Sequence, residues 1–87
     1  MRPENPIHPG EMLLEEFLLP MKKAQSEFAS ELDWTPAKLN ELIKGKRGIT
    51  ADSALDLAEA LGTSPEVWMN LQVMWDLHQA EKKRKTG

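Results

Sequence analysis

The sequence contains no cysteine, which excludes disulfide bridges and thiolate metal sites. Its two histidines, His8 and His78, are far apart and lack the spacing of metal ligands. No apolar run approaches the roughly 20 residues of a membrane-spanning helix, and residues 1–6 lack the apolar core of a signal peptide. We therefore expect a cytoplasmic protein that uses no metal or cofactor and has no membrane partner.

Catalytic constellations are also missing from the sequence. It offers no nucleophile–base pair and no phosphate-binding glycine loop. The carboxylates of Glu11, Glu15 and Glu16 come early in the first predicted helix. There they suit the positive end of the helix dipole and a solvent-exposed face. We expect no enzymatic activity.

The length and the charge pattern narrow the class further. A chain of 87 residues predicts a single domain over 1–87. So small a domain buries only about 60% of the surface of its unfolded chain, and a partner subunit would add stability. The net charge of −3 argues against non-specific coating of nucleic acid. From Lys38 to Arg47, however, the sequence has four positively charged residues and one acidic residue, Glu41. This patch suits contact with DNA through one face, although the charges alone also fit an ordinary solvated surface.

Breaks in the apolar pattern predict a compact all-α fold of five helices. Capping residues followed by proline mark helix starts, and glycines mark helix ends. The predicted helices span 9–19, 25–32, 36–43, 51–61 and 65–81, and the basic tail 82–87 is expected to fray. In the fourth helix, the face expected to be buried comprises Ala51, Ala54, Leu55, Ala58 and Leu61.

The segment 25–44 has the pattern of a helix-turn-helix, in which the second helix enters the major groove of DNA. Ala29 supplies the small residue that close helix packing requires. The turn, where glycine is common, carries Asp33, which tolerates the left-handed backbone region. Trp34 follows, where a small aliphatic residue is usual. The alternative is a helical hairpin that only packs a core.

Blocks along the chain carry a family resemblance. They are His8-Pro9-Gly10-Glu11, Gln25–Ala29, Gly45-Lys46-Arg47-Gly48-Ile49-Thr50, Ala58–Pro65 and Trp68-Met69-Asn70-Leu71-Gln72. Through them, the chain resembles the HigA/VapI-type antitoxins of the lambda-repressor-like (XRE, Cro/repressor) helix-turn-helix family. The resemblance implies a dimeric DNA-binding antitoxin that represses its own operon. It also implies a partner, an mRNA-cleaving toxin of the HigB type.

The resemblance also implies roles for individual residues. Lys38 and Asn40 are placed to read guanine and adenine, and Glu41 either accepts a hydrogen bond from cytosine or pairs with a neighbouring lysine. Phosphate contacts are expected at the start of the helix 25–32 and from the cations that follow the helix 36–43. The full predicted DNA-binding set is Gln25, Ser26, Thr35, Pro36, Ala37, Lys38, Asn40, Glu41, Lys44, Lys46 and Arg47.

The fifth helix has more apolar residues than one buried face requires. One stripe is expected to complete the core, and another to meet a second chain, because aromatic and methionine side chains are enriched at interfaces. The alternative is a helix sunk deep in a small core. The predicted dimer interface comprises Trp68, Leu71, Met74, Trp75 and His78.

Three functions therefore remain in view. The first is an antitoxin that represses its own promoter and binds a toxin. The second is a stand-alone transcriptional regulator with the same fold and no toxin. The third is a protein-interaction module that has lost DNA binding, against which the basic residues around Lys38 and Arg47 argue. A toxin gene next to this one would distinguish the first from the second.

Overall fold

Helices are the only regular secondary structure in the computed structural model, which describes residues 5–86 and contains no strand in that range. The elements, in order, are α1 (Pro9–Leu13), η1 (Leu14–Leu18), α2 (Gln25–Leu32), α3 (Pro36–Ile43), α4 (Ala51–Leu61) and α5 (Pro65–Thr86). Because η1 continues α1 without a break, the predicted all-α fold of five helices is confirmed. Residues 1–4, part of the segment used to exclude a signal peptide, and Gly87 lie outside the described residues.

The helix ends follow the capping residues. The side chains of Thr35 and Thr50 accept hydrogen bonds from backbone N–H groups in the first turns of α3 and α4. Ser64 Oγ does the same at the start of α5. At the C-terminal ends of α2 and α4, Asp33 and Gly62 take the left-handed conformation with φ of 59° and 72°. Local sequence chemistry therefore determines where these helices begin and end.

The first helix contains a π-helical turn that the sequence pattern did not predict. Leu19 N–H donates to the carbonyl of Leu14 at 2.9 Å, five residues back. Leu13 and Leu18, which are also five residues apart, are both fully buried. A π-turn widens the helix locally, and here it accompanies the burial of two leucines whose spacing does not fit one face of an α-helix.

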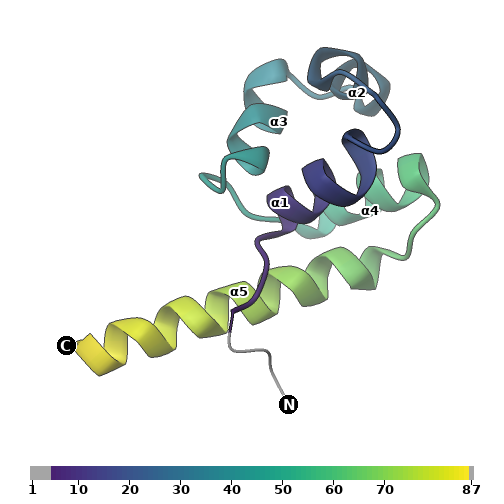
Figure 1. Ribbon diagram of the computed structural model, residues 1–87. Helices are drawn as coiled ribbons and strands as arrows, with labels where there is room; N and C mark the ends of the chain where they lie inside the picture. The colour runs from purple at the N-terminus through teal and green to yellow at the C-terminus, as the bar shows by residue number, and fades with distance from the viewer. Residues whose placement is uncertain (1–4, 87) are drawn as a thin grey trace.

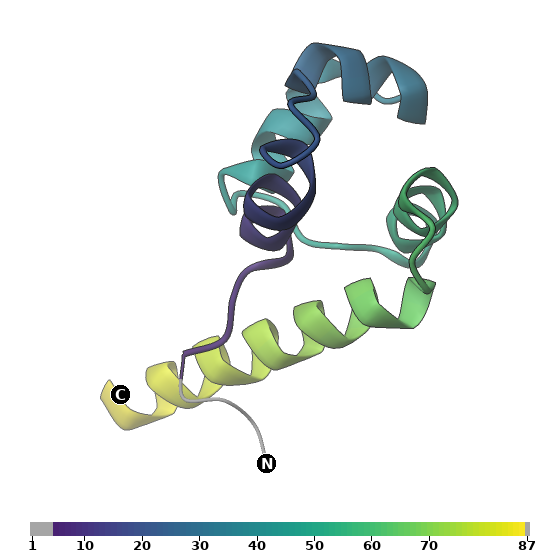
Figure 2. The ribbon, with the colours of Figure 1, turned by 45° about the vertical axis from the view of Figure 1, so that its right-hand side comes forward.

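All the helices contribute to one hydrophobic core. Its fully buried side chains include Leu13, Phe28, Leu39, Leu57 and Trp68, one from each of the five helices. Figure 1 shows α5 running along one side of the molecule, beneath α1 and α4, while α2 and α3 lie on the side away from α5. The same arrangement is visible from a second direction in Figure 2. The α2–α3 pair is therefore presented away from the longest helix.

The buried face of α4 differs from the predicted one. Leu55 was expected in the core but is 56% exposed, whereas Leu57 is fully buried. Ala54 and Ala58 are buried as predicted, while Ala51 is exposed. The predicted stripe shares Ala54, Ala58 and the partly buried Leu61 with the real one. The two alanines do not indicate to which side of them the fully buried leucine lies.

The C-terminal segment also differs from the prediction. Helix α5 continues through Lys82–Lys85 to Thr86 instead of fraying after residue 81. Its last turns extend beyond the other helices (Figure 1). The cations stabilise this end because they face the negative end of the helix dipole. Among residues 5–86, no helix is long and apolar enough to cross a membrane.

Candidate nucleic-acid interface

Helices α2 and α3 form a helix-turn-helix unit with the close packing that the sequence predicts. Ala29 is 1% exposed, and its carbonyl accepts a hydrogen bond from Trp34 N–H at 2.9 Å. Phe28 and Leu39 fix the two helices to the core. The left-handed Asp33 makes the turn between them. The second helix of the unit is thereby held rigidly with one face towards solvent.

Trp34, the residue that departs from the usual pattern, links the turn to the rest of the domain. Its ring is 8% exposed, and its indole N–H donates to Asp56 Oδ2 of α4 at 2.9 Å. Lys38 Nζ lies 4.2 Å from the centre of the ring. An ammonium over an aromatic face is attracted by the ring quadrupole. Trp34 thus ties α4 to the turn and orients a predicted base-reading side chain.

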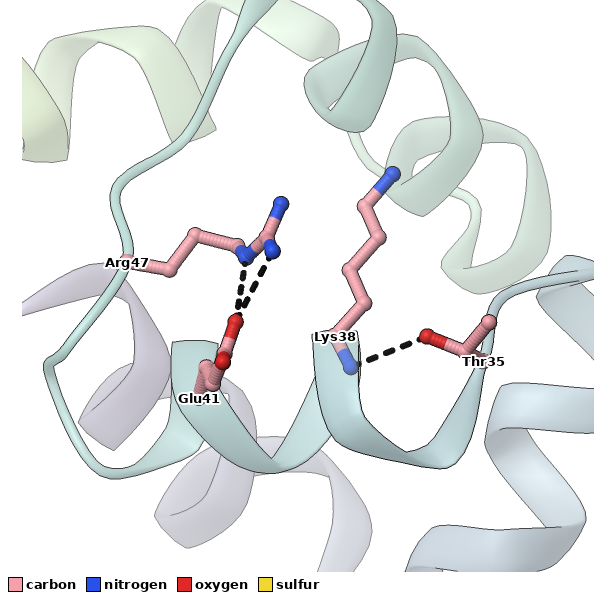
Figure 3. Close-up of polar contacts among 4 residues, drawn as sticks. All are labelled: Thr35, Lys38, Glu41 and Arg47. Atoms are coloured by element: carbon pink, nitrogen blue, oxygen red, sulfur yellow. Dashed lines mark hydrogen bonds and ion pairs between the residues drawn. The ribbon is translucent and has the colours of Figure 1, made fainter.

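The starts of α2 and α3 lie next to each other. The Thr35 side chain accepts from Lys38 N–H at 3.1 Å and caps α3 (Figure 3). Asn40 Nδ2 lies 3.5 Å from Gln25 Oε1, across the two helices. A shallow surface depression here is lined by predicted DNA-binding residues of both helices, namely Gln25, Ser26, Pro36, Ala37 and Asn40. The unpaired backbone N–H groups of helix starts favour anions, as phosphate contact requires.

The loop after α3 brings cations to the edge of this face. Lys44, Lys46 and Arg47 are exposed. Arg47 donates from Nε and Nη2 to Glu41 Oε1 at 3.0 and 2.8 Å. Figure 3 shows Arg47 reaching over α3, with the Lys38 side chain extending to the same side in that view. Of the two roles predicted for Glu41, ion pairing is observed, but with Arg47 and not with a lysine.

Two residues that position α3 are absent from the predicted site. His8 caps α1, its Nδ1 accepting from Gly10 N–H at 3.0 Å. A side chain on Gly10 would collide with the backbone carbonyl of Leu42 in α3, so only glycine permits this contact. Both residues belong to the His8-Pro9-Gly10-Glu11 block of the family resemblance. The sequence does not reveal their structural role, because that role depends on a contact with a helix distant in the chain.

Another residue absent from the predicted site is Gln72 on α5, which contacts the loop after α3. Gln72 Oε1 accepts from Ile49 N–H at 2.7 Å, and Gln72 Nε2 donates to Asp76 Oδ1 at 2.9 Å. Ile49 lies in the loop that carries Lys46 and Arg47. Gln72 closes the Trp68–Gln72 block of the family resemblance, yet nothing in its local pattern identifies its partner.

The predicted dimer interface requires one correction. Trp68 has no exposed surface within the single chain, and its indole N–H donates to Thr63 Oγ1 at 2.8 Å. Since it is a core residue, its assignment to the interface is wrong. The other members of the set, Leu71, Met74, Trp75 and His78, are half-buried.

Buried His8 lies beside α5. It is 6% exposed, and its ring meets that of Trp75 edge-on at a centroid distance of 5.1 Å. Burial lowers the pKa of His8 below its usual 6.5, and the carboxylates of Asp76 and Glu11 oppose part of that shift. No group of three or more potential metal-ligating side chains occurs among residues 5–86.

Comparisons with known proteins agree with this geometry. The helix-turn-helix family HTH_3 matches residues 14–68. Virulence-associated protein I of Dichelobacter nodosus is 41% identical over 80 residues, which span 92% of this chain and 74% of that protein. The HTH-type transcriptional regulator YddM of Escherichia coli is 34% identical over 82 residues, which span 94% of this chain and 86% of that protein.

Similar solved structures include antitoxins of the helix-turn-helix family. Antitoxin GraA superposes with a TM-score of 0.88 and 40% identity, over 98% of this chain and 88% of GraA. The Pseudomonas aeruginosa antitoxin HigA with the higBA promoter superposes with a TM-score of 0.89 and 35% identity, over 94% of this chain and 89% of HigA. The chain belongs to the helix-turn-helix family, within the group of HigA-type antitoxins.

Proposed function

We propose that this protein is a sequence-specific DNA-binding antitoxin that binds the operator of its own operon as a homodimer, represses that operon in the cytoplasm, and neutralises an mRNA-cleaving toxin. The observation that carries the DNA-binding part is the shared face of α2, α3 and the following loop. There the helix start capped by Thr35, the neighbouring start of α2 and exposed cations meet. That the similar HigA of Pseudomonas aeruginosa is described with a promoter supports the same use of this face.

The side chains of this face divide into two tasks. Lys38 and Asn40 project from α3 and read base edges. Gln25, Ser26, Lys44, Lys46 and Arg47 hold phosphates on either side, with Thr35, Pro36 and Ala37 bringing the start of α3 close to the duplex. Phosphate contacts contribute affinity to every sequence, whereas base contacts distinguish one sequence from another.

Dimerisation through α5 is part of the proposal. Val67, Val73 and Leu77 are 43–47% exposed on this helix, and Leu71, Met74, Trp75 and His78 keep part of their surface accessible. One recognition helix reaches only a few base pairs, whereas a two-fold dimer reads two half-sites about 34–36 Å apart. The exposed apolar residues of α5 supply a surface for that second chain.

Membership of the antitoxin group supports the proposed toxin neutralisation. A regulator with the same fold and no toxin is the alternative, and co-expression with the product of the adjacent gene distinguishes the two. Rescue of growth and co-purification of both chains would support the antitoxin. If the neighbouring product is harmless and does not co-purify, the protein is a stand-alone regulator.

Fluorescence anisotropy tests DNA binding. The duplex upstream of the gene is compared with an unrelated duplex of equal length at two salt concentrations. We expect a preference for the upstream duplex of about a thousandfold or more. Lys46→Ala should weaken binding to both duplexes, whereas Asn40→Ala should reduce the preference. Equal binding of the two duplexes by the wild type would contradict the proposed function.

A further inference from the structure

The loop between α3 and α4, residues 44–50, must hold its cations in place to contribute to DNA binding. Lys46 and Arg47 lie in its middle, and both are exposed. At its start, Lys46 N–H donates to the carbonyl of Glu41 at 2.8 Å, and Gly45 takes a φ of 76°. A flexible loop would lose conformational entropy each time it bound phosphate, so a loop held in position before binding has the higher affinity.

The far end of this loop is tied to another helix by a side-chain hydrogen bond. Gln72 Oε1 accepts from Ile49 N–H at 2.7 Å. The amide of Gln72 also fills the space beside Gly48, where a Cβ would lie 2.9 Å from its Cδ, Nε2 and Oε1 atoms. Residue 48 must therefore be small for Gln72 to reach Ile49.

Asp76 fixes the orientation of the Gln72 amide. Asp76 Oδ1 accepts from Gln72 Nε2 at 2.9 Å, one turn further along α5. An amide can turn by half a rotation and exchange its oxygen and nitrogen. A carboxylate that accepts from the nitrogen directs the oxygen towards Ile49 N–H. Ile49 itself is 6% exposed and packs in the core, so the junction between loop and core is well defined.

We propose that Gln72 is a positioning residue for DNA binding, which holds the 44–50 loop so that Lys46 and Arg47 meet the phosphate backbone. The inference rests on the proposed DNA-binding function and adds to it a contribution from α5, which lies on the opposite side of the fold from the recognition helix (Figures 1 and 2). Because α5 also carries the proposed dimer surface, Gln72 connects that surface with the DNA-contacting loop.

The main test compares Gln72→Ala with the matched control Gln79→Ala, which removes the same side chain from the same helix two turns later. Binding is measured by anisotropy on the upstream duplex and on an unrelated duplex, over a series of salt concentrations. We expect Gln72→Ala to bind both duplexes about tenfold more weakly. Its slope of log K against log salt should be shallower by about one to two units, because each lost phosphate contact removes about 0.9. The control should bind as the wild type does.

A second pair of variants tests the direction of the hydrogen bonds. Gln72→Glu keeps an acceptor for Ile49 N–H but places a second carboxylate against Asp76. It should therefore bind DNA weakly. Adding Asp76→Asn restores a donor for the new carboxylate, and the double variant has the same net charge as the wild type. The double variant should recover most of the affinity and the salt slope, which simple destabilisation of α5 would not produce. This comparison also decides the matter if Gln72→Ala fails to fold.

Amide hydrogen exchange gives a readout that needs no DNA. The Ile49 N–H should be protected in the wild type and the double variant, and should exchange faster in Gln72→Ala. If the wild type binds its duplex and Gln72→Ala binds equally well with the same salt slope, the inference is overturned and the proposed function stands. A wild type that binds no DNA would overturn both.

Discussion

Glu41 reduces the net positive charge on the shared face of α2, α3 and the following loop. It is the only acidic residue between Lys38 and Arg47, and its Oε1 receives two hydrogen bonds from Arg47. In the free protein, a carboxylate thus occupies the guanidinium group that the proposed function assigns to phosphate. DNA must compete with this carboxylate for Arg47, and the competition weakens binding to any sequence.

We therefore expect Glu41→Gln to bind every duplex more tightly, by about threefold to tenfold at low salt, since an opposing charge near the phosphates is removed. The fold should be preserved, because a surface ion pair contributes little to stability. Anisotropy on the upstream and unrelated duplexes checks this, with Glu59→Gln on α4 as the charge-matched control. A loss of affinity confined to duplexes with one particular base pair would instead mean that Glu41 reads cytosine.

His8 makes the stability of the domain depend on pH. Burial lowers the pKa of its folded-state imidazole below 6.5, its value in the unfolded chain. The unfolded chain then binds the proton more readily, so His8 lowers stability as the pH falls below 6.5 and through the folded-state pKa. Protonation of Nδ1 would also remove the acceptor for Gly10 N–H. We expect the free energy of unfolding to fall in this window, by less than about 1.4 kcal/mol per pH unit for one proton.

Urea titrations between pH 7.5 and 5.5 measure this dependence, and His8→Asn supplies the control. Asparagine caps helices well and does not titrate, so this variant should keep the cap and lose most of the slope in this range. An unchanged slope would assign the pH dependence to other groups.

At the scale of helices, the packing of α1 against α3 depends on Gly10. Replacing glycine by alanine within a helix ordinarily stabilises a protein by about 0.5–1 kcal/mol. Here the new Cβ would collide with the backbone of Leu42, which cannot move aside as a flexible side chain can. We expect Gly10→Ala to lower the free energy of unfolding by about 1–3 kcal/mol and to weaken DNA binding, because the end of α3 must shift.

Urea denaturation checks the stability, and Gly62→Ala is the comparison. No atom lies near a Cβ built at Gly62, whose φ is 72°, so alanine there incurs only backbone strain. That strain is about 1–2 kcal/mol, and the substitution should leave DNA binding unchanged. A Gly10→Ala variant more stable than the wild type would show that α1 and α3 do not pack as closely as described.

The helices were predictable to the extent that local chemistry defines them. Thr35, Thr50 and Gly62 set helix ends through contacts within a few residues, and these ends are where they were expected. The π-turn at Leu14–Leu18 was not predicted, because helical periodicity assumes regular α-geometry. Helix α5 is longer than predicted, because a run of cations is typical of a frayed end but also suits the helix dipole.

In the candidate site, too, roles set by local sequence could be predicted, whereas contacts between distant residues could not. Residues whose roles follow from position in the helix-turn-helix, such as Thr35 and Asn40, could be named from the sequence. Contacts such as Trp34 with Asp56, or Ile49 with Gln72, join residues that lie 22 and 23 positions apart in the chain. No local pattern specifies such a pair, because each partner separately fits an ordinary helix surface.

At the scale of the whole molecule, the long helix α5 leaves apolar side chains exposed that a second chain could cover. The helix has 22 residues and extends past the helices on which it packs (Figure 1). Its exposed apolar residues, Val67, Val73 and Leu77, keep 43–47% of their surface in contact with water in the single chain. A dimer through this helix would bury them and would also place two recognition helices on one duplex.

Met74→Lys tests the dimer, because Met74 is half-buried on α5 and lysine introduces a charge where apolar contact is proposed. We expect the dimer to dissociate at least about tenfold more readily, as for a substitution at an important interface position. Leu55→Lys on α4 is the control, since Leu55 is apolar and 56% exposed but is not part of the proposed interface. Analytical ultracentrifugation measures the association, and anisotropy on a full operator and on a single half-site measures its consequence.

Met74→Lys should lose affinity for the full operator and keep that for the half-site, since each recognition helix remains intact. Equal sedimentation of both variants and the wild type would remove α5 from the dimer, and the second recognition helix would then have to be brought to the DNA by another surface.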